Sequence, residues 1–554
     1  MAKELTEELS VAEQISPSDM AELAAQGFRS VICNRPDGEG SDQPLFAEIA
    51  AAATAAGLEA RYIPVATGRV TDEDAAAFGA AVAELPKPVI AYCRSGTRST
   101  TLWALSEAGH RPPEDIIKRA RLAGYDVTGV MQRVAQKGAV DTDKPAASHD
   151  IVIVGGGAAG AAVAASLLRR APDLDIAVID PAAVHYYQPG WTMVGAGIFT
   201  AQSTAKPMAA VLPHRVTWIK AAVANFEPEH NSVILEGCRA IRYNHLIVCP
   251  GIKLNWNGVE GLAETLGHNG VTSNYRYDLA PYTWELVRSL RAGKAVFTQP
   301  PMPIKCAGAP QKAMYLSADH WLRNGRLKDI DVSFYNAAGV LFGVPEYVPA
   351  LMEYVNRYSA TLNFHHNLVA IDGPAQRAWF KKTGPDGATE TVETEFDMIH
   401  VCPPQLAPDF IRASPLADGA GWVDVDHATL RHKRYPNIYG LGDAACTPNA
   451  KTAAAARKQA PVVAENVLCA KGRRENVRAY NGYGSCPLTV ERGKIVLAEF
   501  LYGGKVSPTF PRYVIDGTRP SRTAWILKER LLPPIYWLAM LKGREWLAKP
   551  KDMA

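Results

Sequence analysis

The feature that most constrains this chain is a glycine-rich turn between a predicted buried strand and a predicted helix. The segment HDIVIVGGGAAGAAVAASLL (149–168) runs through Gly155-x-Gly157-x-x-Gly160. Glycines at this spacing permit a tight turn and close approach of a pyrophosphate, and the helix N-terminus offers free N–H groups to the phosphates. A second predicted strand, DIAVID, ends at Asp180, 20 residues after Gly160, where an acid can bind ribose hydroxyls. We predict a dinucleotide site formed by Gly155, Gly157, Ala158, Ala159, Gly160 and Asp180; the alternative is a glycine-rich turn without a ligand.

A second segment, far along the chain, favours FAD over a nicotinamide. YPNIYGLGD (435–443) predicts a strand that ends in Gly442-Asp443 before a helix, and it resembles the segment by which flavoproteins with two dinucleotide domains hold the FAD ribitol. Flavin enzymes that also bind a nicotinamide carry a second glycine motif near the middle of the chain. Here the corresponding strand, KAVFT (294–298), leads into QPPMPIKCAGAPQK, where prolines and a cysteine replace the phosphate-binding glycines. We therefore expect thiol chemistry at this second nucleotide site.

Several long motifs resemble the sulfide:quinone oxidoreductase family, in particular its two-cysteine type, and the resemblance covers nearly all of 149–545. The motifs are HYYQPGWTMVGAG (185–197), PIKCAGAPQKAMYL (303–316), AGWVDVD (420–426), RYPNIYGLGDA (434–444), PNAKTAAAARKQAP (448–461) and GSCPLTVERGKIVLAEF (484–500). The resemblance implies non-covalent FAD as cofactor and a quinone as electron acceptor. It adds to the predicted cofactor site Gln188, Gly251, Gly442, Asp443, Lys451 and Thr452. Lys451 is implied beside the isoalloxazine, where a cation stabilises reduced flavin; the alternative is a solvated lysine.

The resemblance also implies a redox pair of cysteines. Cys306 matches the member that passes electrons to the flavin, and the neighbouring Lys305 can favour its thiolate. The family often places the partner directly after Gly-Asp, but that position is Ala444 here, so we expect Cys446, two residues on. The competing partners are Cys402 and Cys249; the cysteines expected to be packing residues are Cys238, Cys469 and Cys486. In the implied reaction, hydrogen sulfide opens a Cys306–Cys446 bridge, electrons pass through FAD to the quinone, and a small thiol such as glutathione, or sulfite, removes the outer sulfur.

The N-terminal region contains a third candidate thiol. In PVIAYCRSGTRSTTLWALSEAG, Cys93 and Arg98 bound a six-residue loop between a predicted strand and a predicted helix. Loop N–H groups, the helix N-terminus and nearby arginines lower the pKa of a thiol at such a position. Tyrosine-phosphatase loops have five residues between Cys and Arg, whereas four is typical of rhodaneses, and the wider segment resembles a small phosphatase-fold family associated with sulfur oxidation. We predict that Cys93 carries sulfane sulfur to an acceptor; a phosphatase and a mere docking domain are the alternatives.

The predicted fold class is α/β, in four parts. These are a phosphatase-like or rhodanese-like domain (1–132), a linker (133–148), two Rossmann-like dinucleotide-binding domains of the disulfide-reductase flavoprotein type (149–515) and an amphipathic helical tail (516–554). The tail sequence RTAWILKERLLPPIYWLAMLKGREWLA (522–548) interleaves apolar, aromatic and basic residues, which favours helices lying in a membrane surface. The alternative is an ordinary amphipathic helix that covers the core.

Composition and charge limit the remaining choices. A net charge of +3 gives no electrostatic case for nucleic acid, and no Cys/His spacing indicates a metal site. The N-terminus has no secretory signal and no apolar run is long enough to span a bilayer. We therefore expect a cytoplasmic protein bound peripherally to the inner face of a bacterial cell membrane, with homo-oligomers left open. The main rival is a type-II NAD(P)H:quinone dehydrogenase, which the missing second glycine motif and Cys306 disfavour.

Overall fold

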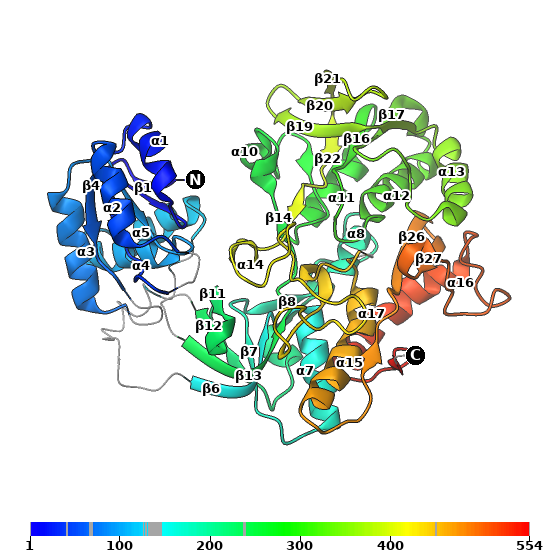
Figure 1. Ribbon diagram of the computed structural model, residues 1–554. Coiled ribbons are helices and arrows are strands. Elements are labelled where there is room, and N and C mark those ends of the chain that lie inside the picture. Colours follow the sequence, from blue (N-terminus) through cyan, green and yellow to red (C-terminus); the bar gives the residue numbers. More distant parts are fainter. Residues whose placement is uncertain are drawn as a thin grey trace.

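Figure 1 shows the computed structural model, in which the N-terminal domain forms a separate body beside a larger two-lobed region. Cys238 and most of the predicted linker lie outside the part of the chain that the structure describes. The described residues are 2–39, 43–65, 70–125, 127, 130, 147–235, 240–448 and 451–552.

The N-terminal domain is a five-stranded sheet with helices on both faces, and the strand predicted directly before Cys93 is confirmed. The strand order is β1-β2-β5-β3-β4, parallel except for β1 against β2. The strands are β1 (Lys3–Thr6), β2 (Leu9–Ala12), β3 (Ser30–Cys33), β4 (Glu59–Tyr62) and β5 (Val89–Tyr92). Side chains alternate along a strand, so α1 (Met20–Ala25) and α2 (Phe46–Ala55) share one apolar core. The opposite core is covered by α3 (Asp72–Glu84), α4 (Thr97–Ser106) and α5 (Pro113–Leu122).

The first lobe of the larger region is built on a mixed sheet whose parallel part has the predicted Rossmann-like arrangement. Strand β6 (Ala147–Val154) pairs with β7 (Ile176–Ile179) on one side and with β13 (Ala240–Val248) on the other. The late strand β24 (Ile438–Gly440) returns to pair in parallel with β13. Helices α7 (Ala158–Arg170) and α15 (Ala453–Ala470) pack against one another. The two motifs that predicted the cofactor site therefore belong to one sheet.

The second lobe repeats the parallel pattern without a glycine motif. Its sheet order is β15-β22-β16-β17-β18, and the central strand β16 (Gly293–Gln299) leads through the Cys306 loop into α12 (Ala309–Arg323). The other strands are β15 (Val271–Thr272), β17 (Ile330–Asn336), β18 (Thr361–Phe364) and β22 (Met398–His400). A late hairpin of β26 (Gly484–Glu491) and β27 (Lys494–Phe500) packs on α12.

The C-terminal tail forms one continuous helical run over 522–542, in which α-helical turns alternate with wider π turns. They are α16 (Arg522–Ile526), a wide turn at Leu527–Leu531, α17 (Leu532–Pro534), a second wide turn at Ile535–Ala539 and a final turn at Met540–Lys542. Pro533 and Pro534 interrupt the regular i to i−4 bonding because they lack backbone N–H groups. Among the described residues, no helix has the length and apolarity needed to cross a membrane.

Candidate active site

The glycine-rich turn has the backbone shape that a pyrophosphate requires. Gly155 lies in the left-handed region at φ 100°, and a Cβ at Gly160 would overlap the carbonyl oxygen of Gly155. At Gly157 no atom lies within 4 Å of the position that a Cβ would take, so that side of the turn is open. Helix α7 begins at the next residue and presents its N-terminal N–H groups there. Asp180 faces the same turn, because its Oδ2 accepts from the N–H of Gly156 at 2.6 Å.

The late Gly-Asp segment completes the same cradle. A Cβ at Gly442 would lie 3.1 Å from the Cβ of Ala159, which places the late turn against the start of α7. The N–H of Gly442 donates to Gln459 Oε1 at 2.7 Å. Asp443 is half-buried, and desolvation raises the pKa of its carboxyl. Gly251 has a positive φ, and no atom lies within 4 Å of the position that a Cβ would take there, so the space beside this glycine is open. These residues fit the FAD that the sequence predicts.

Lys451 and Thr452 lie where α15 begins. Thr452 caps the helix, because its Oγ1 accepts from the N–H of Ala455 at 3.1 Å. Lys451 is buried, and its Nζ donates to the carbonyl oxygens of Asp443 and Ala445 at 2.8 and 2.9 Å. Burial lowers the pKa of Lys451 to about 8. The Lys451 ammonium therefore stabilises the Gly442-Asp443 turn. Its predicted action on reduced flavin stays a prediction.

The loop after β16 brings two sulfur atoms together. Cys306 has φ 53°, in the left-handed region that non-glycine residues seldom occupy, and its N–H donates to Lys451 O at 2.9 Å. Its Sγ lies 3.7 Å from Cys486 Sγ, on β26. A Cβ at Gly308 would lie 2.6 Å from Cys486 Sγ, so only glycine there lets β26 approach so closely. This pair can form a disulfide after a small movement, because S–S bonds measure about 2.05 Å.

The sulfur that lies beside Cys306 is that of Cys486, which the sequence assigned to packing, and not that of Cys446, the expected partner. Cys446 follows the Gly-Asp turn into a different corner of the first lobe, where the N–H of Val425 donates to its sulfur at 3.3 Å. Its N–H is also bonded to Val423, which fixes the loop in that position. Cys446 is thus held by contacts with the backbone of Val423 and Val425, and its pairing with Cys306 stays a prediction.

The competing cysteines are not placed as partners either. Cys249 lies below the phosphate-binding turn, and its Sγ donates to Gly155 O at 3.6 Å. Cys402 belongs to the apolar cluster beside Cys306, but burial raises the pKa of its thiol to about 12, so it stays protonated. Cys469, near the end of α15, is half-buried and its Sγ lies 3.8 Å from the Glu475 carbonyl oxygen, so its packing role stays a prediction.

Two buried lysines surround the sulfur pair. Lys312, one turn into α12, places its Nζ 3.1 Å from Cys306 Sγ and 3.9 Å from Cys486 Sγ. The hydrogen bond from Cys486 and the Lys312 ammonium hold the pKa of Cys306 well below its usual range. The same sulfur–sulfur hydrogen bond, with burial, raises the pKa of Cys486. Lys528 of the tail is also buried, and burial together with the Lys312 charge lowers its pKa to about 7.

Lys305 links the thiol loop to the predicted flavin-lining residue Gln188. Its Nζ donates to Gln188 Oε1 at 2.7 Å and lies over the ring of Trp191, 5.6 Å from the centroid. Burial lowers the pKa of Lys305. The residue therefore sits between the cofactor cradle and Cys306, rather than on the sulfur itself, where Lys312 lies.

The Cys93 loop of the N-terminal domain follows the predicted strand–loop–helix arrangement. Gly96, at φ 82°, precedes α4, and a Cβ there would overlap the Tyr125 hydroxyl. Cys93 is buried. Arg98 is also buried, and its guanidinium donates to Asn34 O at 2.9 Å and to Glu39 Oε1 at 2.8 Å. Arg98 thus fastens α4 to the loop after β3; its predicted catalytic role stays a prediction.

Three residues that matter to these sites were missed by the sequence reasoning. They are Cys486, Lys312 and Gln459. Cys486 had a signal, because it lies within a motif that carried the family resemblance. Lys312 lies three residues after Ala309, the first residue of α12, so it faces the same side as the loop. Among the described residues, no group of His, Cys, Asp and Glu side chains could hold a metal ion.

Comparisons with known proteins cover both parts of the chain. Residues 2–110 match the family "Beta-lactamase hydrolase-like protein, phosphatase-like domain", and residues 149–285 match "Pyridine nucleotide-disulphide oxidoreductase". A mitochondrial sulfide:quinone oxidoreductase of Dictyostelium discoideum is 42% identical over 377 residues, which cover 68% of this chain and 81% of the relative. A beta-lactamase hydrolase-like protein of Agrobacterium fabrum is 37% identical over 140 residues, 25% of this chain and 32% of that protein.

Solved structures support the fold of the larger region. The sulfide:quinone oxidoreductase of the hyperthermophilic bacterium Aquifex aeolicus superposes with a TM-score of 0.60 at 19% identity, covering 72% of this chain and 92% of that one. At this identity the likeness bears on the fold alone.

Proposed function

Because this chain belongs to the sulfide:quinone oxidoreductase family, we propose that it oxidises hydrogen sulfide to sulfane sulfur and passes the electrons through FAD to a quinone. The observation that carries the proposal is the sulfur pair: Cys306 and Cys486 lie 3.7 Å apart, in the loop where a second nucleotide-binding turn would stand. A buried ammonium lies 3.1 Å from one sulfur only, so the two sulfurs differ in their chemistry.

This asymmetry supports one direction for the first step. Hydrosulfide attacks Cys486 Sγ of the oxidised pair, the S–S bond breaks, and Cys306 leaves as a thiolate. Cys306 is the better leaving group because its pKa is low and the Lys312 ammonium is in contact with it. Cys486 then carries the persulfide, next to a thiolate that can release electrons.

FAD, when bound, accepts two electrons from the thiol site and delivers them to the quinone. The residues that would hold it are the turn at Gly155–Gly160, Asp180 and the Gly442-Asp443 turn, with Gln188 and Lys305 toward the sulfur pair. A small thiol removes the outer sulfur of Cys486 and the Cys306–Cys486 bridge is restored. In total, one hydrogen sulfide and one thiol yield one persulfide, two electrons and two protons.

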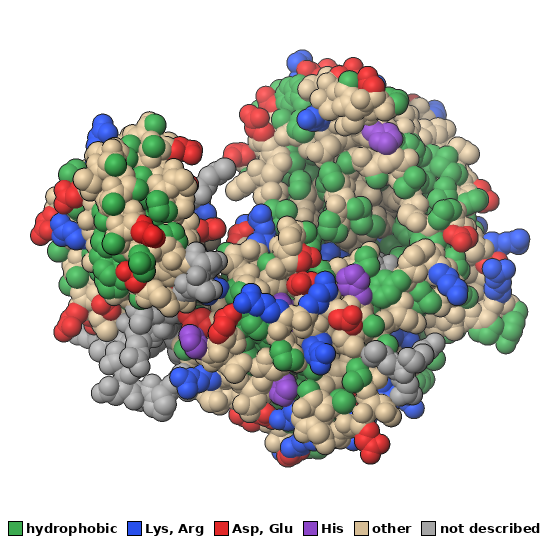
Figure 2. Space-filling view, viewed as in Figure 1, with side chains coloured by type: hydrophobic (Ala, Val, Ile, Leu, Met, Phe, Trp, Pro, Cys, Tyr) green, Lys and Arg blue, Asp and Glu red, His purple; other side chains and the backbone are tan. Residues whose placement is uncertain are grey.

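Contact with a membrane follows from the quinone, which is dissolved in lipid. The tail exposes Ile526, Leu531 and Leu538, and Trp546 and Leu547 near its end are also exposed. Apolar and aromatic side chains beside basic ones suit a helical segment lying in the bilayer surface. Figure 2 shows apolar side chains with Lys and Arg nearby at the edge of the molecule where α16 lies in Figure 1. Peripheral association with the inner face of a bacterial membrane remains part of the proposal.

We propose that the N-terminal domain transfers the sulfane sulfur through Cys93. A persulfide on Cys93 would lie in the loop that ends at the N-terminus of α4, which favours an anionic sulfur. The four residues between Cys93 and Arg98 support sulfur rather than phosphate chemistry. Thiosulfate:cyanide sulfur transfer that disappears in Cys93→Ser supports this; aryl-phosphate hydrolysis that disappears in the same variant supports a phosphatase.

The principal experiment is anaerobic stopped-flow absorbance of the holoenzyme. Sulfide should bleach the flavin within one turnover and a soluble quinone should restore its colour, whereas NADH should leave it oxidised. Cys306→Ser should abolish the bleaching. Rapid bleaching by NADH but not by sulfide would instead identify a nicotinamide:quinone dehydrogenase.

A further inference from the structure

The arginine at the end of the Cys93 loop is bound to a carboxylate of its own domain. Arg98 is buried, its Nη2 donates to Glu39 Oε1 at 2.8 Å, and its Nη1 donates to Asn34 O at 2.9 Å. Both terminal nitrogens of the guanidinium therefore have partners inside the domain. An arginine that binds a phosphoryl group uses the forked N–H groups of the guanidinium, which contact two oxygens of the anion at once. In this domain Glu39 occupies part of that fork.

Glu39 is itself fixed in place by a second arginine. Its other oxygen, Oε2, accepts from Arg35 Nε at 2.9 Å, and Arg35 Nη1 donates to Gln14 Oε1 at 2.7 Å. The Glu39 side chain is only 17% exposed, and the side chains of the two arginines are each 7% exposed. Separating such a pair leaves an uncompensated buried charge, so the carboxylate stays beside Arg98 when a substrate enters. We call Arg35, Glu39 and Arg98 the buried ion-pair network.

The buried ion-pair network lies beside the reactive loop. Asn34, which accepts from the network, donates its own N–H to Tyr92 O at 2.8 Å. Gln14, the second acceptor, donates its N–H to Arg94 O at 3.4 Å. Tyr92 and Arg94 are the residues before and after Cys93 in the chain. The supports of the network are thus in contact with both chain neighbours of Cys93.

A fixed carboxylate at this place distinguishes bound anions by their charge. It offsets the positive charge of Arg98, and it repels a second negative charge on a group bound against that arginine. A phosphate monoester carries close to two negative charges at neutral pH, and thiosulfate carries two. The terminal sulfur of an organic persulfide carries one at most. The loop N–H groups and the N-terminus of α4 can stabilise that single charge without an arginine fork.

We propose that Glu39, acting through Arg98 as a positioning residue, makes the Cys93 site selective for an organic persulfide over thiosulfate and phosphate esters. The inference rests on the sulfur transfer proposed for Cys93, and its substrate is the persulfide that the flavin domain is proposed to release. The Cys93 thiolate attacks the outer sulfur, a new S–S bond forms on Cys93, and the bond to the inner sulfur breaks, so the donor leaves as a thiolate. This exchange needs no oxidant. Thiosulfate is then a weak donor for the wild-type protein, which still accepts its sulfur.

The test measures how fast each donor places sulfur on Cys93 in the full-length holoenzyme. The reaction with glutathione persulfide or thiosulfate is quenched by alkylation, and the peptide that contains Cys93 is analysed by mass spectrometry. Glu39→Gln keeps the size of the side chain and removes its charge. We expect its rate constant with thiosulfate to rise about tenfold, and that with glutathione persulfide to change by less than about threefold. A rate that rises cannot result from misfolding, and Glu39→Asp, which keeps the charge, should retain the wild-type preference.

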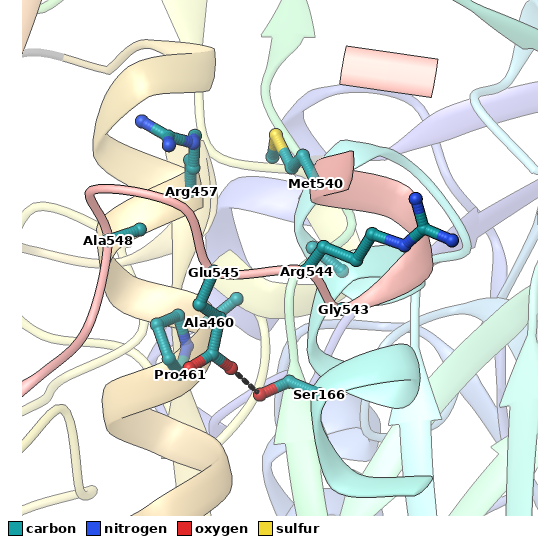
Figure 3. Close-up of a pocket in the computed structure, with 10 residues that line it drawn as sticks. Ser166, Arg457, Ala460, Pro461, Met540, Gly543, Arg544, Glu545 and Ala548 are labelled. Carbon is teal, nitrogen blue, oxygen red and sulfur yellow. Dashed lines mark hydrogen bonds between the residues drawn. The ribbon is translucent and has the colours of Figure 1, made fainter. Parts of the chain in front are cut away.

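Glu545→Gln is the matched control. The Glu545 side chain is 16% exposed, and it accepts from Arg170 Nη2 and Ser166 Oγ, both at 2.7 Å, where the end of the tail packs against α7 (Figure 3). The substitution therefore removes an equally buried carboxylate from another arginine pair. Both rate constants of Cys93 should stay unchanged in this variant.

The wild type provides a readout that needs no variant. Millimolar inorganic phosphate should not slow the reaction of Cys93 with glutathione persulfide, whereas it should slow this reaction in Glu39→Gln. Inhibition of the wild type by phosphate, a wild-type preference for thiosulfate, or a thiosulfate rate that does not rise in Glu39→Gln overturns the inference. In each of these cases sulfur still reaches Cys93, and the proposed transfer stands. If neither donor places sulfur on Cys93, the proposed function of the N-terminal domain fails instead.

Discussion

The two cysteine loops of this protein, around Cys93 and around Cys306, share an architecture but differ in their surroundings. Each follows a central parallel strand and precedes a helix. At Cys93 the nearby Arg98 is bonded to Asn34 and Glu39, on the neighbouring loop. At Cys306 the nearby Lys312 points at the sulfur itself, and a second sulfur lies 3.7 Å away.

The difference shows what each chemistry needs. Carrying a sulfur atom between two molecules leaves the number of electrons on the carrier unchanged, so one thiol in a loop of N–H groups is sufficient. Removing two electrons from sulfide needs a bond between two sulfurs that can open and close, and a charge that holds one of them as thiolate. The strand–loop–helix unit is common to both, and the partner brought by β26 makes the second one a redox site.

The largest effect is expected from removing the partner sulfur. Cys486→Ser should slow sulfide-driven bleaching of the flavin by at least about 10³-fold, because no disulfide can form, as with loss of other essential nucleophiles. Cys446→Ser should retain nearly wild-type rates. Stopped-flow absorbance of the flavin measures both. Equal losses in the two variants would return Cys446 to the redox pair.

The two loops should also be separable. Cys93→Ser should reduce thiosulfate:cyanide sulfur transfer to the background rate, because the only sulfur carrier of that loop is gone. The same variant should bleach with sulfide at the wild-type rate. The first activity is measured as the thiocyanate formed, which gives a coloured complex with iron(III). A parallel loss of flavin reduction would mean that the loops do not act independently.

A smaller effect is expected from the ammonium beside Cys306. Charged hydrogen bonds are worth roughly 1.5–3 kcal/mol, so Lys312→Met should slow the sulfide reaction about 10- to 100-fold near neutral pH. The pKa of Cys306 is lowered in the wild type, so the variant needs a higher pH to form the thiolate. Alkylation of the reduced enzyme by iodoacetamide, followed against pH, should show its midpoint shifted upward. Lys312→Arg should shift it less, because the charge is kept.

The smallest effect is expected from the spacing of the two sulfurs. Gly308→Ala would place a methyl group 2.6 Å from Cys486 Sγ, so the hairpin must move away. We expect a loss of a few-fold to about tenfold in the sulfide reaction, by misplacement of a reacting atom. Gly493→Ala, in the β26–β27 turn, is a control that strains the backbone without crowding the sulfur. If the two variants behave alike, the close approach at Gly308 is unimportant.

The parts of the fold that could be predicted are those with local patterns. The structures of the turn at Gly155–Gly160 and of the strand ending at Asp180 are each determined by a few neighbouring residues, so a local pattern is enough to predict them. The Gly442-Asp443 turn was also placed correctly, although β24 joins the sheet from far along the chain, because its sequence is distinctive. The partner of Cys306 could not be derived in this way. Cys486 lies 180 residues away, and a strand pattern does not state which loop the strand will cover.

The tail shows a second limit of local patterns. Its mixture of apolar, aromatic and basic residues predicted helices lying in a membrane surface, with no indication of which basic side chain would be buried. Lys528 instead points inward, because Pro189 and the sulfur pair offer it partners there. The inward direction of this long side chain depends on acceptors that are far away in the sequence. The periodicity of the tail holds no information about them.

The position of β26 near the end of the chain has a consequence for biosynthesis. Residues 1–483 already include both halves of the nucleotide cradle and the Cys306 loop, and the sulfur that completes the pair follows them in the chain, on β26. During translation the nascent enzyme can thus fold its scaffold while Cys306 has no disulfide partner beside it. The strand that supplies the second sulfur is therefore made after the loop that carries the first, and a chain released before β26 would have the scaffold without the pair.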